Sequence, residues 1–353
     1  MMNKIKIVYL TDTSIPTERV MEDDVQEILK KLEPYNVDIT YVRDQKGWSR
    51  QQFVEYASEM EQKGADKMEQ CEELLNKAED ADIIIANFAP VGSKIIEAAK
   101  KLKLICVTRS GAENVAIDTA TENGVKVVVA PGRLADPVAD YTVGLMLAES
   151  RNIARDSMNA KGEWDSSRPL NFEHIKSLRN KTVGIVGFGL IGRNVAKRVQ
   201  AFGCNVIAYD PFLNEDVMKE NNAKKVSMEE LMSNADYVCV HARLTKETEG
   251  LVSKELIKMM KPSSFFINTA RAGLVDEDAL IEALKNKSIA GAGLDVFKTE
   301  PLPKDHPLMN LDNVTLTPHR AGGTSDLAAL SIDIVVKDIE RFLNGEELVN
   351  KRN

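Results

Sequence analysis

The sequence predicts an α/β protein built from two doubly wound, mostly parallel sheets. Apolar strand-like segments alternate with helical patterns along both halves of the chain. The chain has 353 residues, which is more than one hydrophobic core usually covers. Its 43% apolar content and 5% aromatic content are typical of an ordinary globular protein. We therefore expect two domains, each with its own sheet.

The first third of the chain contains five strand-like segments, separated by segments of helical periodicity. The expected strands are 5–10, 37–42, 82–86, 104–108 and 125–129. Residues 45–80 interrupt this rhythm with two polar helical patterns on either side of Gly64. We interpret this segment as solvated surface helices packed on the edge of the sheet, in preference to a functional role.

A second alternating block begins at Pro131 and Gly132, which mark a boundary. A long apolar helix is expected over 138–155. The expected strands of this block are 182–186, 205–209, 236–240, 264–268, 289–295 and 314–316. The chain then returns to an amphipathic helix, with Thr324 or Ser325 as its predicted N-terminal cap.

Charge and cysteine content restrict the class of ligand and the compartment. The net charge of −8 and the absence of a basic run argue against a nucleic-acid or membrane surface, so a small-molecule ligand is expected. None of the four cysteines has a CxxC spacing, which favours buried thiols in a reducing compartment. The N-terminus is too short and too charged for a signal peptide, and no apolar run reaches 18 residues. These features predict a cytoplasmic protein.

A glycine-rich turn lies between a strand and a helix of the second block. Gly187, Gly189 and Gly192 form a G-x-G-x-x-G pattern, and Asp210 ends the next strand 23 residues after Gly187. Such glycines allow a tight turn, close approach of a pyrophosphate to the backbone, and close helix packing. A carboxylate at Asp210 can bind ribose hydroxyls but repels a 2′-phosphate, which favours NAD(H) over NADP(H). The alternatives are a turn without a ligand and an Asp that caps the turn before Pro211.

Three further polar residues follow predicted strands. Arg271, Glu300 and His319 can meet because strand carboxyl ends converge on the ligand crevice of a doubly wound sheet. They would supply a cation for a substrate carboxylate, a histidine for proton transfer, and a carboxylate to hold that histidine. Taken singly, the arginine could be a surface salt-bridge residue and the glutamate a solvated turn residue.

Four ordered motifs give the chain a resemblance to the D-isomer-specific 2-hydroxyacid dehydrogenases, the family of phosphoglycerate, glycerate and D-lactate dehydrogenases. They are "GFGLIG" with Asp210, "NTARAGLVDE", "GLDVFKTEP" and "TPHRAGG". The resemblance implies a Rossmann NAD-binding domain at 131–321, inserted in a flavodoxin-like substrate-binding domain formed by 1–130 and 322–353. It also implies a homodimer or higher homo-oligomer, with the helix at 138–155 at a dimer interface. The apolar sequence of this helix is equally compatible with full burial within one subunit.

The resemblance also implies roles for individual residues and no metal site. Arg271 would bind the substrate carboxylate and carbonyl, His319 would be the acid/base, and Glu300 would favour the charged form of His319. The implied cofactor contacts are Gly187, Gly189, Leu190, Ile191, Gly192, Asp210, His241, Thr269, Ala270 and, at the nicotinamide carboxamide, Asp295. The implied substrate loop is Arg109, Ser110, Gly111 and Ala112, whose N–H groups would receive the substrate carboxylate.

The expected activity is the NAD-dependent interconversion of a 2-keto acid and a D-2-hydroxy acid. One alternative is an NADH-sensing co-regulator of the C-terminal-binding type, and another is a formate dehydrogenase, which is disfavoured because such relatives carry Gln where Glu300 stands. Arg320 and Arg243 depart from the family, which usually has a small apolar residue and a proline there. Arg320 suggests a substrate with an extra anionic or polyhydroxylated end, with a surface salt bridge as the alternative.

Overall fold

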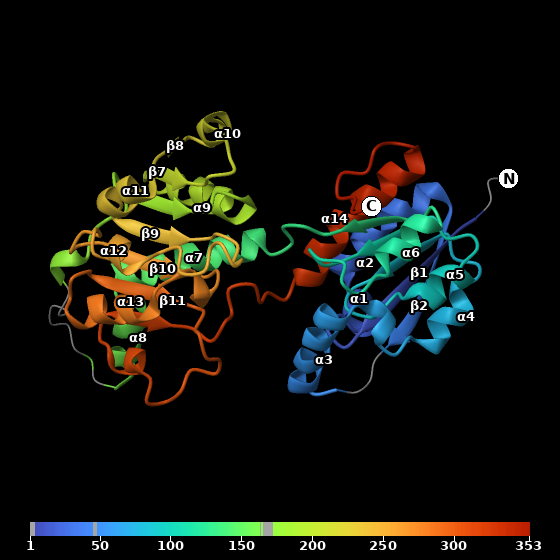
Figure 1. Cartoon of the computed structure of the whole chain (residues 1–353), viewed down its shortest axis with the longest axis horizontal. Helices are drawn as coiled ribbons and strands as arrows, with labels where there is room; N and C mark the ends of the chain where they lie inside the picture. The colour runs from blue at the N-terminus through green and yellow to red at the C-terminus, as the bar shows by residue number, and fades with distance from the viewer. Residues whose placement is uncertain (1–3, 45–47, 163, 165–171) are drawn as a thin grey trace. The chain divides into compact units, whose positions relative to one another are not determined.

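The computed structural model describes residues 4–44, 48–162, 164 and 172–353. The chain divides into two compact units, one formed by Met1–Arg133 with Thr324–Asn353 and the other by Leu134–Gly323. Each unit is built on a parallel sheet, as the colours and labels of Figure 1 show. The predicted fold class, two doubly wound α/β domains, is therefore confirmed.

The first unit contains a five-stranded sheet in the order β2-β1-β3-β4-β5, the order of flavodoxin-like sheets. Its strands are β1 (Ile5–Asp12), β2 (Val37–Asp44), β3 (Ile83–Ala86), β4 (Leu104–Val107) and β5 (Lys126–Val129). All pairs are parallel, and Ile7 of β1 lies between Ile39 of β2 and Ile83 of β3. Strands β3 and β4 are buried throughout, because helices cover both faces of the sheet.

Two hydrophobic cores lie on the two faces of this sheet. Helices α4 (Glu72–Ala78), α5 (Ser93–Ala98) and α6 (Ile117–Glu122) cover one face. Helices α1 (Thr17–Val20), α2 (Asp23–Leu29) and α14 (Leu327–Asn344) cover the other, with a 3₁₀ turn at Lys30–Tyr35. Asp326 precedes α14 without a side-chain hydrogen bond, so the predicted cap at Thr324 or Ser325 is wrong: both residues lie before the cap position.

Residues 48–80 form a helical segment that the regular strand-helix alternation does not require. It comprises α3 (Arg50–Lys63), a 3₁₀ turn (Ala65–Lys67) and α4, and residues 45–47 lie outside the described part of the chain. Gly64 separates the helices with φ 77°, a left-handed value that favours glycine. Ser49 caps α3 through a capping box with Gln52. Met60 is fully buried, and the ring of Phe53 packs edge-on against Phe88 with 4.9 Å between the ring centroids, so apolar side chains anchor α3 to the unit.

The second unit contains a seven-stranded parallel sheet in the order β12-β11-β10-β9-β6-β7-β8. Its strands are β6 (Thr182–Val186), β7 (Asn205–Tyr209), β8 (Ala223–Lys225), β9 (Tyr237–Val240), β10 (Phe265–Asn268), β11 (Gly291–Leu294) and β12 (Val314–Leu316). This is the Rossmann strand order with one additional strand beyond β11. Strand β8 was not predicted, because it is a three-residue edge strand in which Lys224 and Lys225 are exposed.

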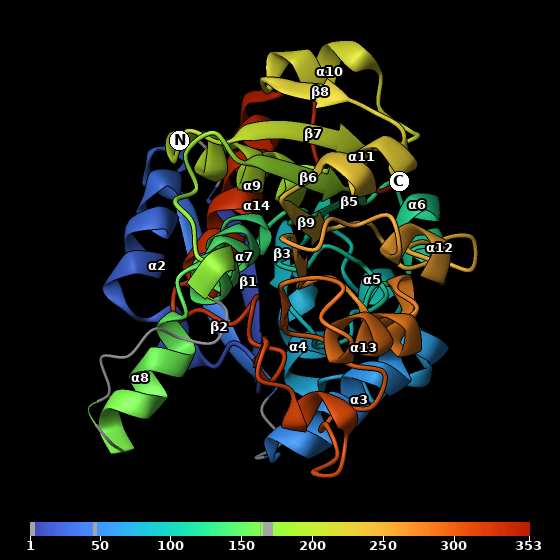
Figure 2. The same cartoon turned by 90° about the vertical axis from the view of Figure 1, so that its left-hand side faces the viewer.

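Helices also cover both faces of this sheet (Figure 2). Helices α7 (Ala135–Ser150), α9 (Leu190–Ala201) and α10 (Glu215–Glu220) share one core, and α11 (Met228–Asn234), α12 (Lys254–Ile257) and α13 (Glu277–Lys285) share the other. Short 3₁₀ turns occur at Phe172–His174, Ala272–Leu274 and Pro307–Asn310.

The single helix predicted over 138–155 is wrong in its extent. The chain breaks at Asn152, which has φ 55°, and a separate helix α8 (Ile153–Gly162) follows α7. Asparagine tolerates this left-handed conformation better than most residues do. Among the helices that the structure describes, none is both long and apolar enough to cross a membrane.

Candidate active site

The polar residues predicted from sequence follow adjacent strands at the carboxyl edge of the seven-stranded sheet. In the order of the sheet they are His319 after β12, Asp295 after β11, Arg271 after β10, His241 after β9, and the glycine turn after β6. Neighbouring strands lie about 4.8 Å apart, so these residues form one row. The second unit alone therefore supplies a continuous polar edge.

His319 and Glu300 are in direct contact. Nδ1 of His319 lies 2.8 Å from Oε2 of Glu300, and the other carboxylate oxygen accepts the N–H of Phe297 at 3.0 Å. The two side chains retain 46% and 36% exposure, so the pair is open to a ligand. His319 has φ 51°, an uncommon value for a residue other than glycine, and such strain is frequent at functional sites.

The fully buried carboxylate of Asp295 fixes the loop that carries His319. It accepts the hydroxyl of Thr317 at 2.6 Å and the backbone N–H groups of Arg320 and Ala321 at 2.8 Å each. The carbonyl of Asp295 accepts the N–H of His319 at 3.0 Å. The left-handed backbone of His319 is thus held from β11, a role that the sequence did not suggest for Asp295.

The loop after β10 is held by the buried side chain of Asn268. This amide accepts the N–H of Ala270 at 3.0 Å and donates to the carbonyl of Arg271 at 3.1 Å. Arg271 is exposed, and its guanidinium donates to the carbonyl of Ala270 at 2.7 Å. The buried hydroxyls of Thr269 and Thr142 lie 2.8 Å apart, which joins the loop to α7. The bracing roles of Asn268 and Thr142 were missed from sequence, although Asn268 stands in the "NTAR" motif.

The glycine turn has the shape that a dinucleotide pyrophosphate requires. Gly187 has φ 89°, and a Cβ there would lie 2.5 Å from the backbone nitrogen of Ala242. A Cβ at Gly192 would lie 2.4 Å from the carbonyl oxygen of Gly187, whereas one at Gly189 would meet no atom within 4 Å. Gly189 therefore leaves open space directly before α9, whose first N–H groups have no acceptor within the helix.

Asp210 links the glycine turn to β7. One carboxylate oxygen accepts the N–H of Phe188 at 2.9 Å, and the other accepts the N–H of Phe212 at 2.9 Å. Both oxygens keep capacity for a further hydrogen bond, since each can accept about two. Next to the turn, Leu190 is 49% exposed and Ile191 is half-buried against the core.

His241 is the one predicted cofactor residue whose side chain lacks a hydrogen bond despite burial. Its backbone N–H donates to the carbonyl of Val186 at 2.7 Å, but neither ring nitrogen has a partner, and both are inaccessible. Burial lowers the pKa of His241 to about 3, so the imidazole is neutral at physiological pH. A buried polar group without a partner is costly, and a bound ligand that offers a hydrogen bond would relieve that cost.

The predicted substrate loop, Arg109 to Ala112, lies in the first unit after β4. The side chain of Arg109 is buried, stacks 3.8 Å from the ring centroid of Phe88 and pairs with Glu61 of α3. Among the hydrogen bonds of the described residues, none uses the N–H of Gly111 or Ala112 as donor. The Glu61–Arg109 pair was missed from sequence. It links the segment interpreted as surface helices directly to this loop.

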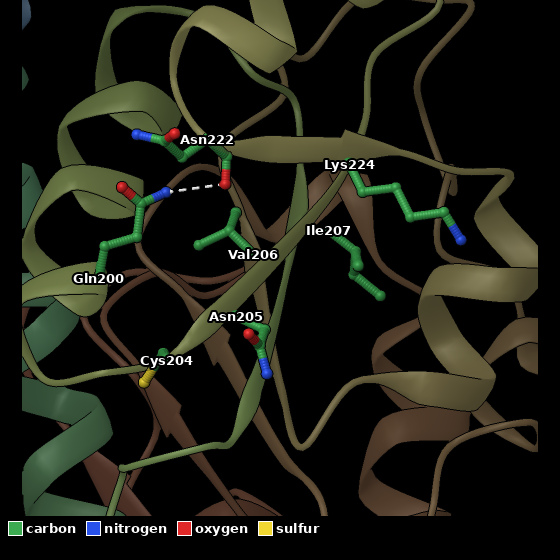
Figure 3. A pocket seen from close by; sticks show the side chains of 7 residues that line it. All are labelled: Gln200, Cys204, Asn205, Val206, Ile207, Asn222 and Lys224. Carbon is green, nitrogen blue, oxygen red and sulfur yellow. Dashed lines mark hydrogen bonds between the residues drawn. The ribbon is translucent and has the colours of Figure 1, made fainter.

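A surface hollow on the second unit lies away from these residues. Gln200, Cys204, Asn205, Ile207 and Lys224 belong to its lining (Figure 3). Asn205 is the first residue of β7, whereas Asp210 follows the last, so the hollow lies at the amino end of the strand. It is separate from the candidate site.

Comparison with known proteins identifies the family. Residues 143–321 match the model of the D-isomer specific 2-hydroxyacid dehydrogenase NAD-binding domain. The chain is 42% identical over 285 residues to the D-3-phosphoglycerate dehydrogenase of Methanocaldococcus jannaschii, covering 80% of this chain and 53% of the relative. It is 38% identical over 286 residues to the glyoxylate reductase of Thermofilum pendens, covering 79% and 84%. The chain belongs to the D-isomer specific 2-hydroxyacid dehydrogenase family.

The structural comparison extends the family relationship to nearly the whole chain. The NAD-complexed D-isomer specific 2-hydroxyacid dehydrogenase of Lactobacillus delbrueckii ssp. bulgaricus is 25% identical, has a TM-score of 0.74, and covers 99% of this chain and 100% of its own. The chain spans about half the length of the phosphoglycerate dehydrogenases that it matches. The second unit is an NAD-binding domain of the D-2-hydroxyacid dehydrogenase family, and its glycine turn and orphaned His241 fit that cofactor.

Proposed function

We propose that the protein is an NAD-dependent D-2-hydroxyacid dehydrogenase that interconverts a 2-keto acid and a D-2-hydroxy acid. The observation that carries this proposal is the contact between His319 and Glu300, with Arg271 on the same edge of the NAD-binding unit. We propose residues 131–321 as the NAD-binding domain. Residues 1–130 and 322–353 together form the proposed substrate-binding domain. Bound NADH supplies hydride to the C2 carbon of the keto acid, and NAD⁺ accepts it in the reverse direction.

His319 is the proposed acid/base, and its contact with Glu300 selects the reacting nitrogen. A carboxylate only accepts hydrogen bonds, so Nδ1 carries a proton whether the ring is charged or neutral. Nε2 is then the nitrogen that gives its proton to the C2 oxygen in reduction and recovers it in oxidation. Glu300 orients the ring and stabilises the imidazolium form.

Arg271 is the proposed ligand of the substrate carboxylate and of the C2 oxygen. Its guanidinium is exposed, and the described residues place no carboxylate within ion-pair distance of it. A planar guanidinium can bind a carboxylate with two N–H groups and can stabilise negative charge on the carbonyl oxygen. For the loop Arg109 to Ala112 we propose that its N–H groups also bind the substrate carboxylate, which is consistent with Gly111 and Ala112 lacking acceptors.

The proposed cofactor contacts are the residues predicted from sequence. Gly187, Gly189, Leu190, Ile191 and Gly192 would hold the pyrophosphate, and Asp210 would bind the adenine ribose. His241, Thr269, Ala270 and Asp295 would line the remainder of the site. For Asp295 the proposal requires a further hydrogen bond, because its carboxylate already accepts three donors from the loop of His319.

Turnover decides between this function and binding alone. Purified protein should oxidise NADH, followed at 340 nm, with at least one member of a panel containing pyruvate, glyoxylate and hydroxypyruvate. His319→Asn should lose most of this activity while NADH binding, measured by fluorescence, is retained. NADH binding without turnover of any keto acid would favour the co-regulator alternative. Reduction of NAD⁺ by formate would favour the formate dehydrogenase alternative.

We also propose a homodimer or higher homo-oligomer in a reducing, cytoplasmic compartment. Helix α8 has no buried residue, and Ile153 and Met158 are 55% and 76% exposed on it, which is consistent with an interface formed by a second copy. The four cysteines are free and buried, which is consistent with a reducing compartment. Size-exclusion chromatography with light scattering would test the oligomer, and a monomer at micromolar concentration would contradict it.

A further inference from the structure

An ion pair joins helix α3 to the proposed substrate loop of the first unit. Nη2 of Arg109, the first residue of that loop, donates to Oε1 of Glu61 on α3 at 2.5 Å. The side chain of Arg109 is only 8% exposed, so this contact differs from an ordinary ion pair between two surface side chains. Because α3 belongs to a segment that the strand-helix alternation does not require, the contact is an addition to the fold.

Aromatic side chains connect α3 to the same guanidinium by a second route. Cζ of Arg109 lies 3.8 Å from the ring centroid of Phe88, which is within the range of a cation–π contact. Phe88 meets Phe53 of α3 edge-on, and its N–H donates to the buried carboxylate of Asp12 at 2.6 Å. Helix α3 therefore holds Arg109 directly through Glu61 and indirectly through the two phenylalanine rings.

Few other groups compensate the charge of Arg109. The carboxylate of Glu113 lies 3.8 Å from Nη2, beyond hydrogen-bond distance, and the buried Nη1 has no partner among the described residues. A second cation is close, since burial and then the charge of Arg109 lower the pKa of Arg133 to about 10. Without the charge of Glu61, the guanidinium would be a poorly compensated buried cation, so we expect it to move.

The position of Arg109 matters because the loop is free just beyond it. The carbonyl of Ser110 accepts a guanidinium N–H of Arg352 at 2.6 Å, so the first two residues of the loop are held. The next two residues are Gly111, whose backbone has more freedom than that of other residues, and Ala112. Their N–H groups donate to no acceptor among the described residues. Where these donors point thus depends on the residues that precede them.

We propose that Glu61 is a positioning residue of the substrate loop, and that α3 serves to hold Arg109. The inference rests on the proposed dehydrogenase function, in which the N–H groups of this loop bind the substrate carboxylate. Glu61 acts through Arg109 and touches neither substrate nor cofactor. Its loss should affect substrate binding more than the chemical step, because the groups proposed for proton transfer belong to the NAD-binding unit.

Glu61→Gln tests the inference, because it removes the charge and keeps the length of the side chain. We would use the member of the panel of pyruvate, glyoxylate and hydroxypyruvate that the native protein reduces best. KM for this acid should rise roughly 5- to 30-fold, as expected when a charge-assisted hydrogen bond is lost, while kcat stays within about twofold. The Kd of NADH, measured by fluorescence, should be unchanged. Glu61→Asp, which keeps the charge on a shorter side chain, should give a smaller rise in KM.

Two further variants separate positioning from a general effect on the helix. Glu59→Gln is the matched control, because Glu59 lies on α3 and pairs only with the exposed Lys63, and its KM should stay within about twofold of native. Phe88→Leu removes the cation–π contact but keeps an apolar side chain, and it should also raise KM. In the double variant with Glu61→Gln, the rise in KM should be smaller than the product of the two single effects, because both groups hold the same guanidinium.

Three results would overturn the inference while leaving the proposed function intact. An unchanged KM in Glu61→Gln would show that the loop does not depend on this ion pair. A lower KM would show that Glu61 competes with the substrate for Arg109. Equal rises in Glu61→Gln and Glu59→Gln would indicate a general effect on α3. A native protein that reduces none of the three acids would contradict the proposed function, and the inference would fall with it.

Discussion

At the scale of single residues, buried polar groups determine where the exposed reactive groups lie. Asp295 and Asn268 are buried and bind the backbone of the loops that carry His319 and Arg271. His319 and Arg271 themselves are exposed. This division is physically reasonable, because a reactive side chain must reach its ligand while its backbone stays in one conformation.

The contact between His319 and Glu300 leads to a prediction about activity. Reduction needs a charged imidazole as proton donor, and in Glu300→Gln a neutral amide replaces the carboxylate at 2.8 Å and cannot stabilise the imidazolium. The variant should therefore lose roughly 10- to 100-fold in kcat for keto-acid reduction. NADH affinity, measured by fluorescence, should stay unchanged, and an unchanged kcat would exclude Glu300 as the partner of His319.

Cofactor choice should depend on Asp210. Native protein should bind NADH far more tightly than NADPH, because the carboxylate repels a 2′-phosphate. Asp210→Ala and Asp210→Asn should narrow this preference by roughly tenfold or more in the ratio of Kd values, measured by fluorescence titration. The Asn variant is the better control, because its side-chain oxygen can still accept one of the N–H groups that hold the turn. Equal affinity of the native protein for both cofactors would contradict the assignment.

At the scale of elements, polar side-chain contacts stabilise the point where one helix ends and the next begins. Helices α7 and α8 are separated by the left-handed Asn152, and the guanidinium of Arg155 spans the break. It donates to both carboxylate oxygens of the fully buried Glu149 at 2.9 Å, to Asn152 at 2.9 Å, and to the carbonyl of Asp312 at 2.6 Å. The apolar periodicity predicts one continuous helix here, because it carries no information about polar contacts. The contact with Asp312 also comes from a residue that is distant in the sequence.

Removal of Arg155 should destabilise the NAD-binding unit in a pH-dependent way. Arg155→Met leaves the carboxylate of Glu149 buried without a cation, which should cost about 3 kcal/mol of unfolding free energy at pH 8. Burial already raises the pKa of Glu149. The loss of unfolding free energy therefore applies at pH values above this raised pKa, where the carboxyl is charged. It becomes smaller as pH falls toward the ordinary glutamate value of about 4.3, because the carboxyl is then protonated. Urea unfolding should therefore show a smaller loss at pH 5 than at pH 8. An equal loss at both pH values would show that Glu149 is not the cause.

At the scale of the whole molecule, the chain begins and ends in the same unit. After the NAD-binding unit, α14 contributes Ile332, Val335 and Ile339 to the core of the first unit. The last residues then pair with β5: Val129 donates its N–H to Asn350, and Arg352 donates to Val127. The buried carboxylate of Asp338 on α14 holds this terminal segment through the N–H groups of Val349 and Asn350.

Asp338→Ala should destabilise the first unit and spare the second. Two backbone N–H groups and the side chain of Asn350 lose their acceptor, which should cost about 2 to 4 kcal/mol of unfolding free energy, measured by urea denaturation. NADH affinity should remain within twofold of native, because the cofactor site belongs to the other unit. Asp333→Ala is the matched control on α14: its pairs with Lys31 and Lys337 are near the surface, and its loss should cost less than about 1 kcal/mol. Reduced NADH affinity in Asp338→Ala would show that the units are not independent.

The sequence by itself determined the two parallel sheets and the row of residues on one sheet edge. Apolar strand-like runs located β6, β7 and β12 at their observed bounds, and the glycine spacing located the cofactor turn. These features are local, since each depends on neighbouring residues of the chain.

Only the tertiary structure decided which partners hold the reactive groups. Asp295 fixes the loop of His319, and Glu61 pairs with Arg109. Arg155 bridges α7 and α8. Each of these contacts joins residues that are far apart in the chain or that belong to different elements. The short strand β8 and the end of α7 are also set by such contacts rather than by local preference. Charged residues such as Arg320 carry no periodic signal of burial or pairing, so whether each is paired or free is settled only when the chain has folded.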